Sequence, residues 1–399
     1  QTPAAPPPAG AQPAAPGDQP VFRAGINAVR VDVIVTDKQG NPVTDLGKDD
    51  FDVTEDDQRQ AVETFRLVQV DRSAPVENLG RLKTRGDEEA AAQDEDARII
   101  IFFLDEYHVR LGSSLAVRKH LVDFVRNQLG PKDLLSVMYP LSPLDSVVLT
   151  RDHEMVIRAL ERFQGRKFDY TPRNALEDRY ANQPTEIVER IRRQVSLSAL
   201  MGLSVKLGAL REGRKAVVLV SEGYIGLLPP QMRGPIATMP GMGNPNRGNP
   251  MAGTDSIAED RARFAAELDV QNELQRVYEA ANRSNTAIYA VDPRGLSTGE
   301  FDIQDTVNIR TSQDSLLQTQ NTLRTLADET DGRAIVNRND LGKGMQQLVR
   351  DSSAYYLLGY TSAQTRSDGK FHEIKVRVKR PGVQVRARKG YWALSATET

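Results

Sequence analysis

The chain has 399 residues, a formal net charge of −2 and no cysteine. Because its 52 basic and 54 acidic residues nearly balance, the composition gives no electrostatic indication of nucleic-acid binding or of attachment to an anionic membrane. The absence of cysteine excludes disulfides, thiolate metal sites and a cysteine nucleophile. No apolar run in the sequence approaches the roughly 18 residues that a transmembrane helix needs.

Residues 1–20 are rich in proline and alanine, and the first residue is Gln1 rather than methionine. Such a composition cannot build a packed core and favours an extended tether. We interpret this segment as the start of a mature exported protein from which a signal peptide has been removed, although an expressed fragment would begin in the same way. The expected location is therefore periplasmic or extracellular.

Residues 21–70 alternate between apolar and polar side chains, which predicts antiparallel strands of a half-exposed sheet. Turns are expected at residues 37–42 and at the acidic residues 55–57. By contrast, residues 71–97 are charged, small and aperiodic, and we interpret them as a linker. The apolar face of the first strand is expected to contain Val29, Val31, Val33 and Val35.

Residues 98–350 have the pattern of an α/β domain. RIIIFFLDEYHV (98–109) is a continuous apolar run, as expected for a strand buried on both faces of a parallel sheet, and KAVVLVSEG (215–223) and TAIYAVDPRG (286–295) repeat this pattern. Strands that alternate with helices predict a doubly wound, mostly parallel sheet. Helices are expected at 114–129, 152–163, 184–210, 256–283, 315–330 and 341–350. Ser113 is expected to cap the first of these helices and Asp152 the second. Further short strands are expected at 134–140, 146–150 and 333–337.

The segment 224–254 is rich in glycine, proline and asparagine and directly follows a buried strand. It is too long for an ordinary connection and should lie over the carboxyl edge of the sheet. Two interpretations are open. The segment is either a disordered insertion or a methionine-bearing loop that binds a partner.

Residues 353–394 return to a period of two, and Asp368-Gly369 is a hairpin signal. Ile374, Val376 and Val378 fall on one face of the expected strand. Each end of the chain alone has too few strands to be stable. We therefore expect the two ends to form one antiparallel β-sandwich into which the α/β domain is inserted.

Three of the apolar strands end in acidic residues: Asp105-Glu106, Glu222 and Asp292. In an open parallel sheet, ligands bind outside the carboxyl ends of the strands, where the strand order reverses. Carboxylates that meet there are suitable ligands for Mg²⁺ or Ca²⁺. The alternative is that these acids cap the following helices or face solvent.

Several segments together resemble a known family. The succession of strands and helices, with Asp105 after the first strand and SEG at the end of a later one, resembles a von Willebrand factor A domain. The chain from about Val29 to Trp392 is similar to a bacterial family described as VWFA-related and abundant in Acidobacteria. The segments that carry this likeness are VDVIVTDKQGNPVTDLGKDDFDVTEDD, IIIFFLDEYHV, LTRDHEMVIRAL, AVVLVSEG, AIYAVDPRG, YYLLGYTS and GVQVRARKGYWA.

The resemblance implies a metal-ion-dependent adhesion site built from Asp-x-Ser-x-Ser, a distant Thr and an Asp. Only Asp105 matches the first motif, because Tyr107 and Val109 stand at the two serine positions. Glu222 stands in for the distal Asp, and Thr171 is a guess for the Thr. We expect no cofactor. If Mg²⁺ or Ca²⁺ does bind, Asp105 and Glu222 would hold it, with help from Glu106 or Asp292.

The resulting functional hypothesis is a non-enzymatic protein–protein interaction or adhesion module. Its partner would bind at the carboxyl edge of the sheet and the 224–254 loop. A structural subunit of an envelope or extracellular assembly is the main alternative. A hydrolase that uses Asp105, His108 and Glu222 is the weaker one, because the chain has no G-x-S-x-G nucleophile motif.

Overall fold

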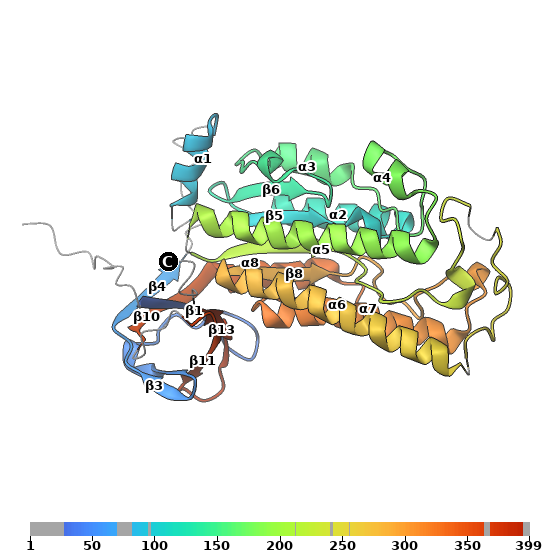
Figure 1. Ribbon diagram of the computed structural model, residues 1–399. Helices are drawn as coiled ribbons and strands as arrows, with labels where there is room; N and C mark the ends of the chain where they lie inside the picture. Colours follow the sequence, from blue (N-terminus) through green and yellow to red (C-terminus); the bar gives the residue numbers. More distant parts are fainter. Residues whose placement is uncertain are drawn as a thin grey trace, which may run out of the picture.

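The computed structural model describes residues 28–69, 82–94, 97–211, 213–239, 242–254, 256–362 and 368–393. Within these residues, the chain forms a mixed α/β fold with a five-stranded parallel sheet and two four-stranded antiparallel sheets (Figure 1). No described helix is both long and apolar enough to cross a membrane. The tether expected at 1–20 lies outside the described residues.

The parallel sheet has its first two strands in reversed order, which creates a switch point between β5 and β7. Every residue of β5, β7 and β8 is buried, as the continuous apolar runs predict. The strand expected at 146–150 is reduced to one antiparallel bridge between Thr150 and Leu135. The strand order is β6 (Leu134–Met138), β5 (Ile99–Leu104), β7 (Lys215–Val220), β8 (Thr286–Val291) and β9 (Ala334–Ile335).

Helices cover both faces of this sheet, so the doubly wound arrangement is as expected. One face packs against α5 (Thr185–Leu210), α6 (Ile257–Arg283) and α7 (Ile309–Glu329). The other face packs against α2 (Leu111–Gln128), α3 (His153–Glu161) and α8 (Leu341–Ser353).

The helix ends differ in part from expectation. Asp152 caps α3 by accepting the N–H of Met155, as predicted. The prediction for Ser113 is wrong, because α2 already begins at Leu111 and Ser113 lies inside it. Asn308 caps α7, which therefore begins six residues before the expected start.

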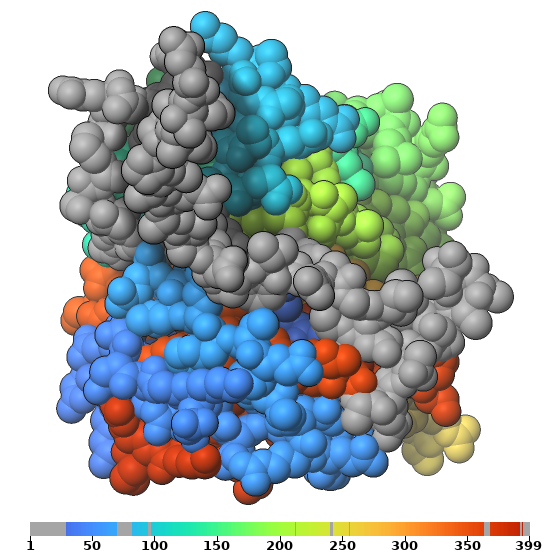
Figure 2. Space-filling view, turned by 90° about the vertical axis from the view of Figure 1, so that its left-hand side faces the viewer, coloured from blue at the N-terminus to red at the C-terminus, as the bar shows by residue number. Residues whose placement is uncertain are grey.

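The two antiparallel sheets both combine strands from the two ends of the chain. One has the order β12 (Gln384–Ala387), β1 (Ala28–Thr36), β10 (Ala354–Thr361), β4 (Thr64–Gln69). The other has the order β13 (Gly390–Trp392), β11 (Phe371–Val378), β2 (Phe51–Glu55), β3 (Gln58–Gln60). Their facing residues share one apolar core, and Figure 2 shows the N-terminal and C-terminal segments, in blue and red, side by side. Along the chain, the α/β unit lies between these N-terminal and C-terminal segments.

Two local features differ from the expected pattern. The hairpin expected at Asp368-Gly369 does not form, because β10 and β11 belong to different sheets. Within the expected linker 71–97, residues 85–92 form helix α1 (Arg85–Ala92). Thr84 and Asp87 form a reciprocal capping box at its start, and Ala92 is buried in the core.

The expected acidic turn does form, with Asp56 and Asp57 at positive φ between β2 and β3. The remaining helical segments are short. They are α4 (Ala175–Tyr180) and the 3-10 helices Lys48–Asp50, Glu106–His108, Leu144–Ser146, Pro230–Met232 and Ile303–Asp305.

The sandwich contacts the amino end of the parallel sheet and leaves its carboxyl end free (Figure 1). Asp351, at the end of α8, accepts hydrogen bonds from Arg333 (2.6 and 2.9 Å) and from Arg386 of β12 (2.6 Å). Burial raises the pKa of Asp351, but the two guanidinium groups outweigh this effect and hold the pKa below its ordinary value.

We expect Asp351→Asn to lower the free energy of unfolding by about 3 kcal/mol, because it leaves two arginines without their shared carboxylate. The stabilisation by Asp351 is present above the unfolded-state pKa of about 3.9 and is lost as the pH falls through the lower folded value. Urea unfolding at several pH values should therefore show a smaller acid-induced loss in the variant. The exposed pair Lys375–Asp57 provides a control, and Asp57→Asn should match the wild type. Equal effects of the two substitutions would contradict this role.

Candidate functional site

The carboxyl ends of three neighbouring parallel strands place acidic side chains at one edge of the sheet. Asp105 follows β5, Glu222 lies two residues beyond β7, and Asp292 follows β8. All three are fully buried. The parallel register aligns Leu104 with Val220 and Val220 with Val291, so these residues leave the sheet at the same level. The three carboxylates nevertheless have separate partners.

Asp105 has hydrogen-bond partners on both carboxylate oxygens. Its Oδ1 accepts from the Ser196 hydroxyl of α5 (2.8 Å), and its Oδ2 accepts from the Ser221 hydroxyl (2.9 Å). The Nδ1 atom of His108 lies 2.9 and 3.0 Å from the two oxygens. Burial raises the pKa of Asp105, but the contacts with His108 and the two hydroxyls together have the larger effect and hold this pKa below its ordinary value.

His108 lies in the short helix after β5 and is only 3% exposed. In a hydrolytic triad, the acid contacts one ring nitrogen and the nucleophilic serine contacts the other. Here Asp105 and Ser196 both approach Nδ1, and Ser196 is fully buried. The ring of Tyr224 packs edge-on against the imidazole at 4.8 Å. This arrangement holds Asp105 in place and does not present a nucleophile to solvent.

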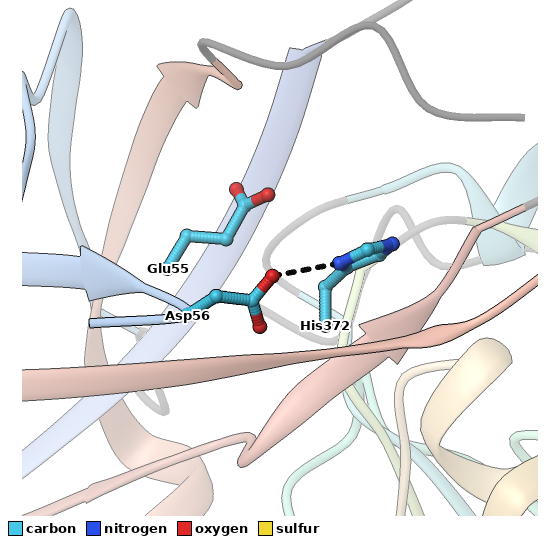
Figure 3. A group of neighbouring side chains, drawn as sticks. All are labelled: Glu55, Asp56 and His372. Atoms are coloured by element: carbon cyan, nitrogen blue, oxygen red, sulfur yellow. Dashed lines mark hydrogen bonds and ion pairs between the residues drawn. The ribbon is translucent and has the colours of Figure 1, made fainter. Parts of the chain in front are cut away.

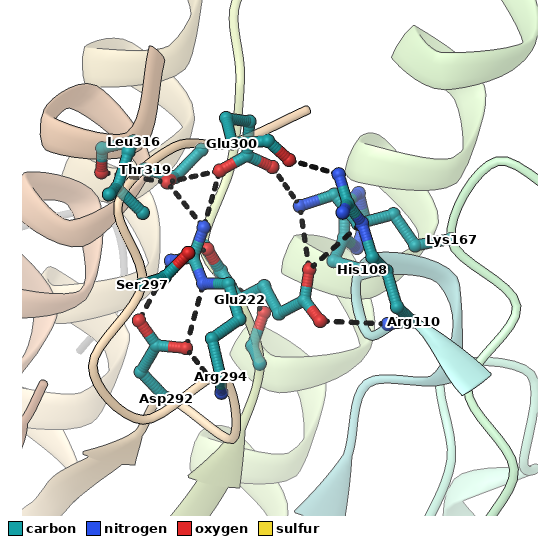
Figure 4. A network of polar contacts seen from close by, with 12 residues as sticks. His108, Arg110, Lys167, Glu222, Asp292, Arg294, Ser297, Glu300, Leu316 and Thr319 are labelled. Atoms are coloured by element: carbon teal, nitrogen blue, oxygen red, sulfur yellow. Dashed lines mark hydrogen bonds and ion pairs between the residues drawn. The ribbon is translucent and has the colours of Figure 1, made fainter. Parts of the chain in front are cut away.

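Glu222 is held by basic groups that the sequence pattern did not single out (Figure 4). Its Oε1 accepts the backbone N–H of Arg110 (2.9 Å), and its Oε2 lies 3.1 Å from the Lys167 ammonium. Lys167 also contacts the buried carboxylate of Glu300. Burial raises the pKa of Glu222, but Lys167 and Arg294 lower it below its ordinary value.

Asp292 forms a two-point ion pair with Arg294, whose Nε and Nη2 atoms lie 2.9 and 2.8 Å from its two oxygens. The same guanidinium contacts Glu300 and donates to the Glu222 carbonyl oxygen at 2.7 Å. Burial alone would lower the pKa of Arg294, but the charges of Glu300 and Asp292 raise it. Thr319 of α7 completes the network by donating to Glu300 at 3.1 Å.

These contacts test whether the residues fit a bound Mg²⁺ or Ca²⁺. The carboxylates of Asp105, Glu222, Asp292 and Glu300 all have protein donors, and none of their oxygens is among the unpaired buried atoms of the described residues. Lys167 and Arg294 supply positive charge to Glu222, Asp292 and Glu300 from within the chain. The residues present therefore do not fit a resident divalent cation, and we assign no metal chemistry to them.

The other residues expected near a metal have different contacts. Tyr107 donates to Glu177 of α4 at 2.8 Å, while Val109 is buried in the apolar core. Thr171 is exposed and hydrogen-bonds through its backbone to Asp169. Glu106 is half-buried, and burial raises its pKa.

Glu177 anchors the loop that carries Lys167. Arg166 binds both of its carboxylate oxygens at 2.8 Å, and Tyr107 donates a further hydrogen bond. Burial raises the pKa of Glu177, but these hydrogen bonds lower it to about 2. The ion pair fixes the residue next to Lys167, so it positions the ammonium between Glu222 and Glu300.

A second polar cluster lies in the sandwich, where ligand atoms of Glu55, Asp56 and His372 fall within 4.8 Å of one another (Figure 3). His372 contacts Asp56 through Nδ1 (2.9 Å) and Asp368 through Nε2 (3.1 Å). Glu55 accepts from the Ser362 hydroxyl at 2.8 Å. Since both ring nitrogens face carboxylates, the cluster ties the β2–β3 turn to β11 rather than presenting a free imidazole nitrogen to a cation.

No protein-family model matches the chain, and no curated protein matches it. The resemblance to the VWFA-related family therefore stays a prediction that depends on the sequence segments.

We expect Lys167→Met to lower the free energy of unfolding by about 3–5 kcal/mol, because it leaves the buried carboxylates of Glu222 and Glu300 without their shared ammonium. Urea denaturation followed by circular dichroism measures this loss. Lys119→Met is the matched control, since the Lys119 side chain is 82% exposed. A loss no larger than that of the control would show that Lys167 does not neutralise the cluster.

Proposed function

We propose that this chain is an exported, non-enzymatic protein-binding module of von Willebrand A type, in which basic side chains replace the metal of the adhesion site. The sheet is parallel apart from one antiparallel bridge, and its order reverses between β5 and β7, which supports the A-type interpretation. Export is part of the proposal, and the Pro/Ala-rich composition of residues 1–20 is typical of an extended tether.

The observation that carries this proposal is that the acids at the carboxyl edge have their partners within the chain. Lys167 and Arg294 pair with Glu222, Glu300 and Asp292, and Asp105 accepts hydrogen bonds from two serine hydroxyls. In a metal-dependent site, an under-neutralised cation is completed by a carboxylate from the partner. Here the buried acids are already paired within the chain, so a partner has no cation to complete. Binding must come instead from the surface of the loops and helices around the edge.

That surface exposes apolar side chains. Ile257, Phe264 and Leu268 are 71%, 63% and 49% exposed on the first half of α6. Their helical spacing places them on one face, opposite Val270 and Leu274 in the core. We call these three residues the α6 stripe. Exposed apolar side chains that lie next to one another mark interaction surfaces, whereas singly exposed ones are ordinary. Met239, Met242 and Met251 of the preceding loop are 52–65% exposed as well.

The loop itself is held by specific hydrogen bonds in its described parts, 224–239 and 242–254. Gln231 donates to the Asn249 carbonyl oxygen (2.9 Å), and Asn244 donates to the Gln231 carbonyl oxygen (2.9 Å). Arg233 connects the loop to Glu259 of α6 at 3.0 Å. These contacts favour an ordered binding loop over a disordered insertion. An ordered loop loses less conformational entropy when a partner binds.

The two alternatives are weighed by the same contacts. The buried arrangement of Asp105, His108 and Ser196 gives no support to a hydrolase. A structural subunit would use the same apolar surface to contact its own copies. Static light scattering of the purified chain distinguishes a self-assembling structural subunit from a module that binds a different protein. An oligomer that dissociates when the α6 stripe is changed would favour the structural subunit.

We expect Phe264→Asp combined with Leu268→Asp to weaken partner binding at least about tenfold, because two apolar contacts are lost from the interface. The partner is first captured from an envelope extract, identified and purified, and its affinity is then measured by calorimetry. Val205→Asp is the control, since Val205 is 60% exposed on the distant half of α5. Equal binding by both variants, or no partner whose capture depends on the stripe, would contradict the proposal.

We also expect no stoichiometric binding of Mg²⁺, Ca²⁺ or Mn²⁺ to the wild-type chain in calorimetric titrations, because the candidate carboxylates are already paired. Stoichiometric binding that disappears in Asp105→Ala would overturn the internally neutralised site and restore a metal-dependent mechanism.

A further inference from the structure

A second surface has an excess of positive charge. It lies at β9, the edge strand of the parallel sheet opposite β6. A hollow of about 730 Å³ lies over the edge strand β9, between α7, α8 and strand β12 of the sandwich. Six basic residues and one acidic residue, Asp328, line it; we call it the basic hollow. Its basic residues are Arg324, Arg333, Arg338, Lys343, Arg350 and Arg386.

Part of this positive charge is fixed by the protein. Arg333 and Arg386 share the single buried carboxylate of Asp351, which holds both guanidinium groups in place on the wall of the hollow. One carboxylate cannot neutralise two arginines, and burial raises the pKa of Asp331, the other acidic residue near Arg386, which favours its uncharged form. The shared pair therefore leaves an excess positive charge at the junction of the α/β unit and the sandwich, and junctions between units are common locations for ligand sites.

The other cations are less compensated. Arg338 and Arg350 are exposed and have no carboxylate within ion-pair distance among the described residues. Among the described residues, Arg324 donates only to the neutral amide oxygens of Asn321 (2.9 Å) and Gln320 (3.3 Å). Lys343 has an exposed ion pair with Asp340. The excess contrasts with the chain as a whole, whose net charge is −2.

The spacing of these cations indicates the shape of the ligand. Lys343 and Arg350 are seven residues apart on one face of α8, which places them roughly 10 Å apart along the helix axis. Guanidinium groups bind the oxygens of phosphate and carboxylate groups in a two-point geometry. A single small anion would reach only part of this set, whereas a ligand with several anionic groups would reach cations on both helices and on β12.

We infer that the basic hollow is a binding site for a small polyvalent oxyanion, a molecule with at least three phosphate or carboxylate groups. The volume of the hollow lies within the range of about 300–1,000 Å³ that small-ligand sites occupy. The site is separate from the carboxyl edge and requires no particular protein partner there. Because β12 supplies Arg386, a bound anion also links the sandwich to the α/β unit.

Calorimetric titration of the full chain with tripolyphosphate, citrate and acetate tests this inference. We expect one molecule of tripolyphosphate or citrate to bind, acetate to fail, and the affinity to fall as salt is added. The stronger of the two ligands distinguishes phosphate from carboxylate chemistry. A hexaglutamate peptide that binds more tightly than both would overturn the small-ligand assignment in favour of an acidic protein segment.

The variant Arg338→Gln with Arg350→Gln should weaken binding by about tenfold or more, since both residues are exposed and their loss does not disturb the core. Arg158→Gln with Arg190→Gln removes the same charge from exposed positions on α3 and α5 and should change the affinity less than about twofold. The thermal midpoint of the wild type should rise with added ligand. Equal weakening in both double variants, or no saturable binding to the wild type, would overturn the proposal.

Discussion

Carboxylates that lose contact with water must find positive charge or hydrogen-bond donors inside the protein, because an isolated buried ion costs several kcal/mol. In this chain that constraint joins side chains from different loops and secondary-structure elements. Arg98 pairs with Asp133, Arg166 with Glu177, and Lys167 with both Glu222 and Glu300. The Arg166–Glu177 pair fixes a loop against α4, and Lys167 connects the same loop to Glu222, beyond β7, and to Glu300. The position of the sandwich on the α/β unit depends on the same principle through Asp351, Arg333 and Arg386.

The same constraint gives the two charged regions of the molecule different properties. At the carboxyl edge, each buried acid has a basic partner or hydrogen-bond donors inside the chain, so these carboxylates are not available to a ligand. At the basic hollow, arginines outnumber carboxylates and several are exposed, so charge remains available to a ligand. The α6 stripe and the basic hollow therefore offer two kinds of recognition, one through apolar contact and one through charge.

The sequence predicted the elements whose side-chain pattern is periodic. The valines of β1 are buried in the sandwich core, as their alternation predicted, but Asp32, Ile34 and Thr36 on the other face are buried too, so the expected half-exposed sheet is wrong for this strand. The apolar run 99–104 correctly identified a strand covered on both sides. Helix α1 was missed because its charged, alanine-rich sequence has no apolar period, although the Thr84 and Asp87 capping signal was present. The Asp368-Gly369 signal misled because a turn dipeptide does not specify whether the next strand stays in the same sheet.

The candidate site was predicted only in part. That Asp105, Glu222 and Asp292 lie at one edge follows from acids at the ends of parallel strands. Their partners could not be found in the same way. Lys167, Arg294 and Glu300 lie in irregular loops, and Ser196 is one of many polar residues on the long helix α5. No periodicity or motif therefore relates these residues to the acids. Only the folded chain brings these side chains together.

The position of β1 has a consequence for the order in which the protein folds. This strand lies between β10 and β12, so Val33 is paired with Tyr356 on one side and with Ala387 on the other. Both neighbours are synthesised more than 300 residues later, after all five strands of the parallel sheet. Contacts over such long sequence separations form slowly. During synthesis, the α/β unit can therefore assemble while β1 still has two unpaired edges. These edges must be kept from pairing with strands of other chains until the C-terminal segment is synthesised.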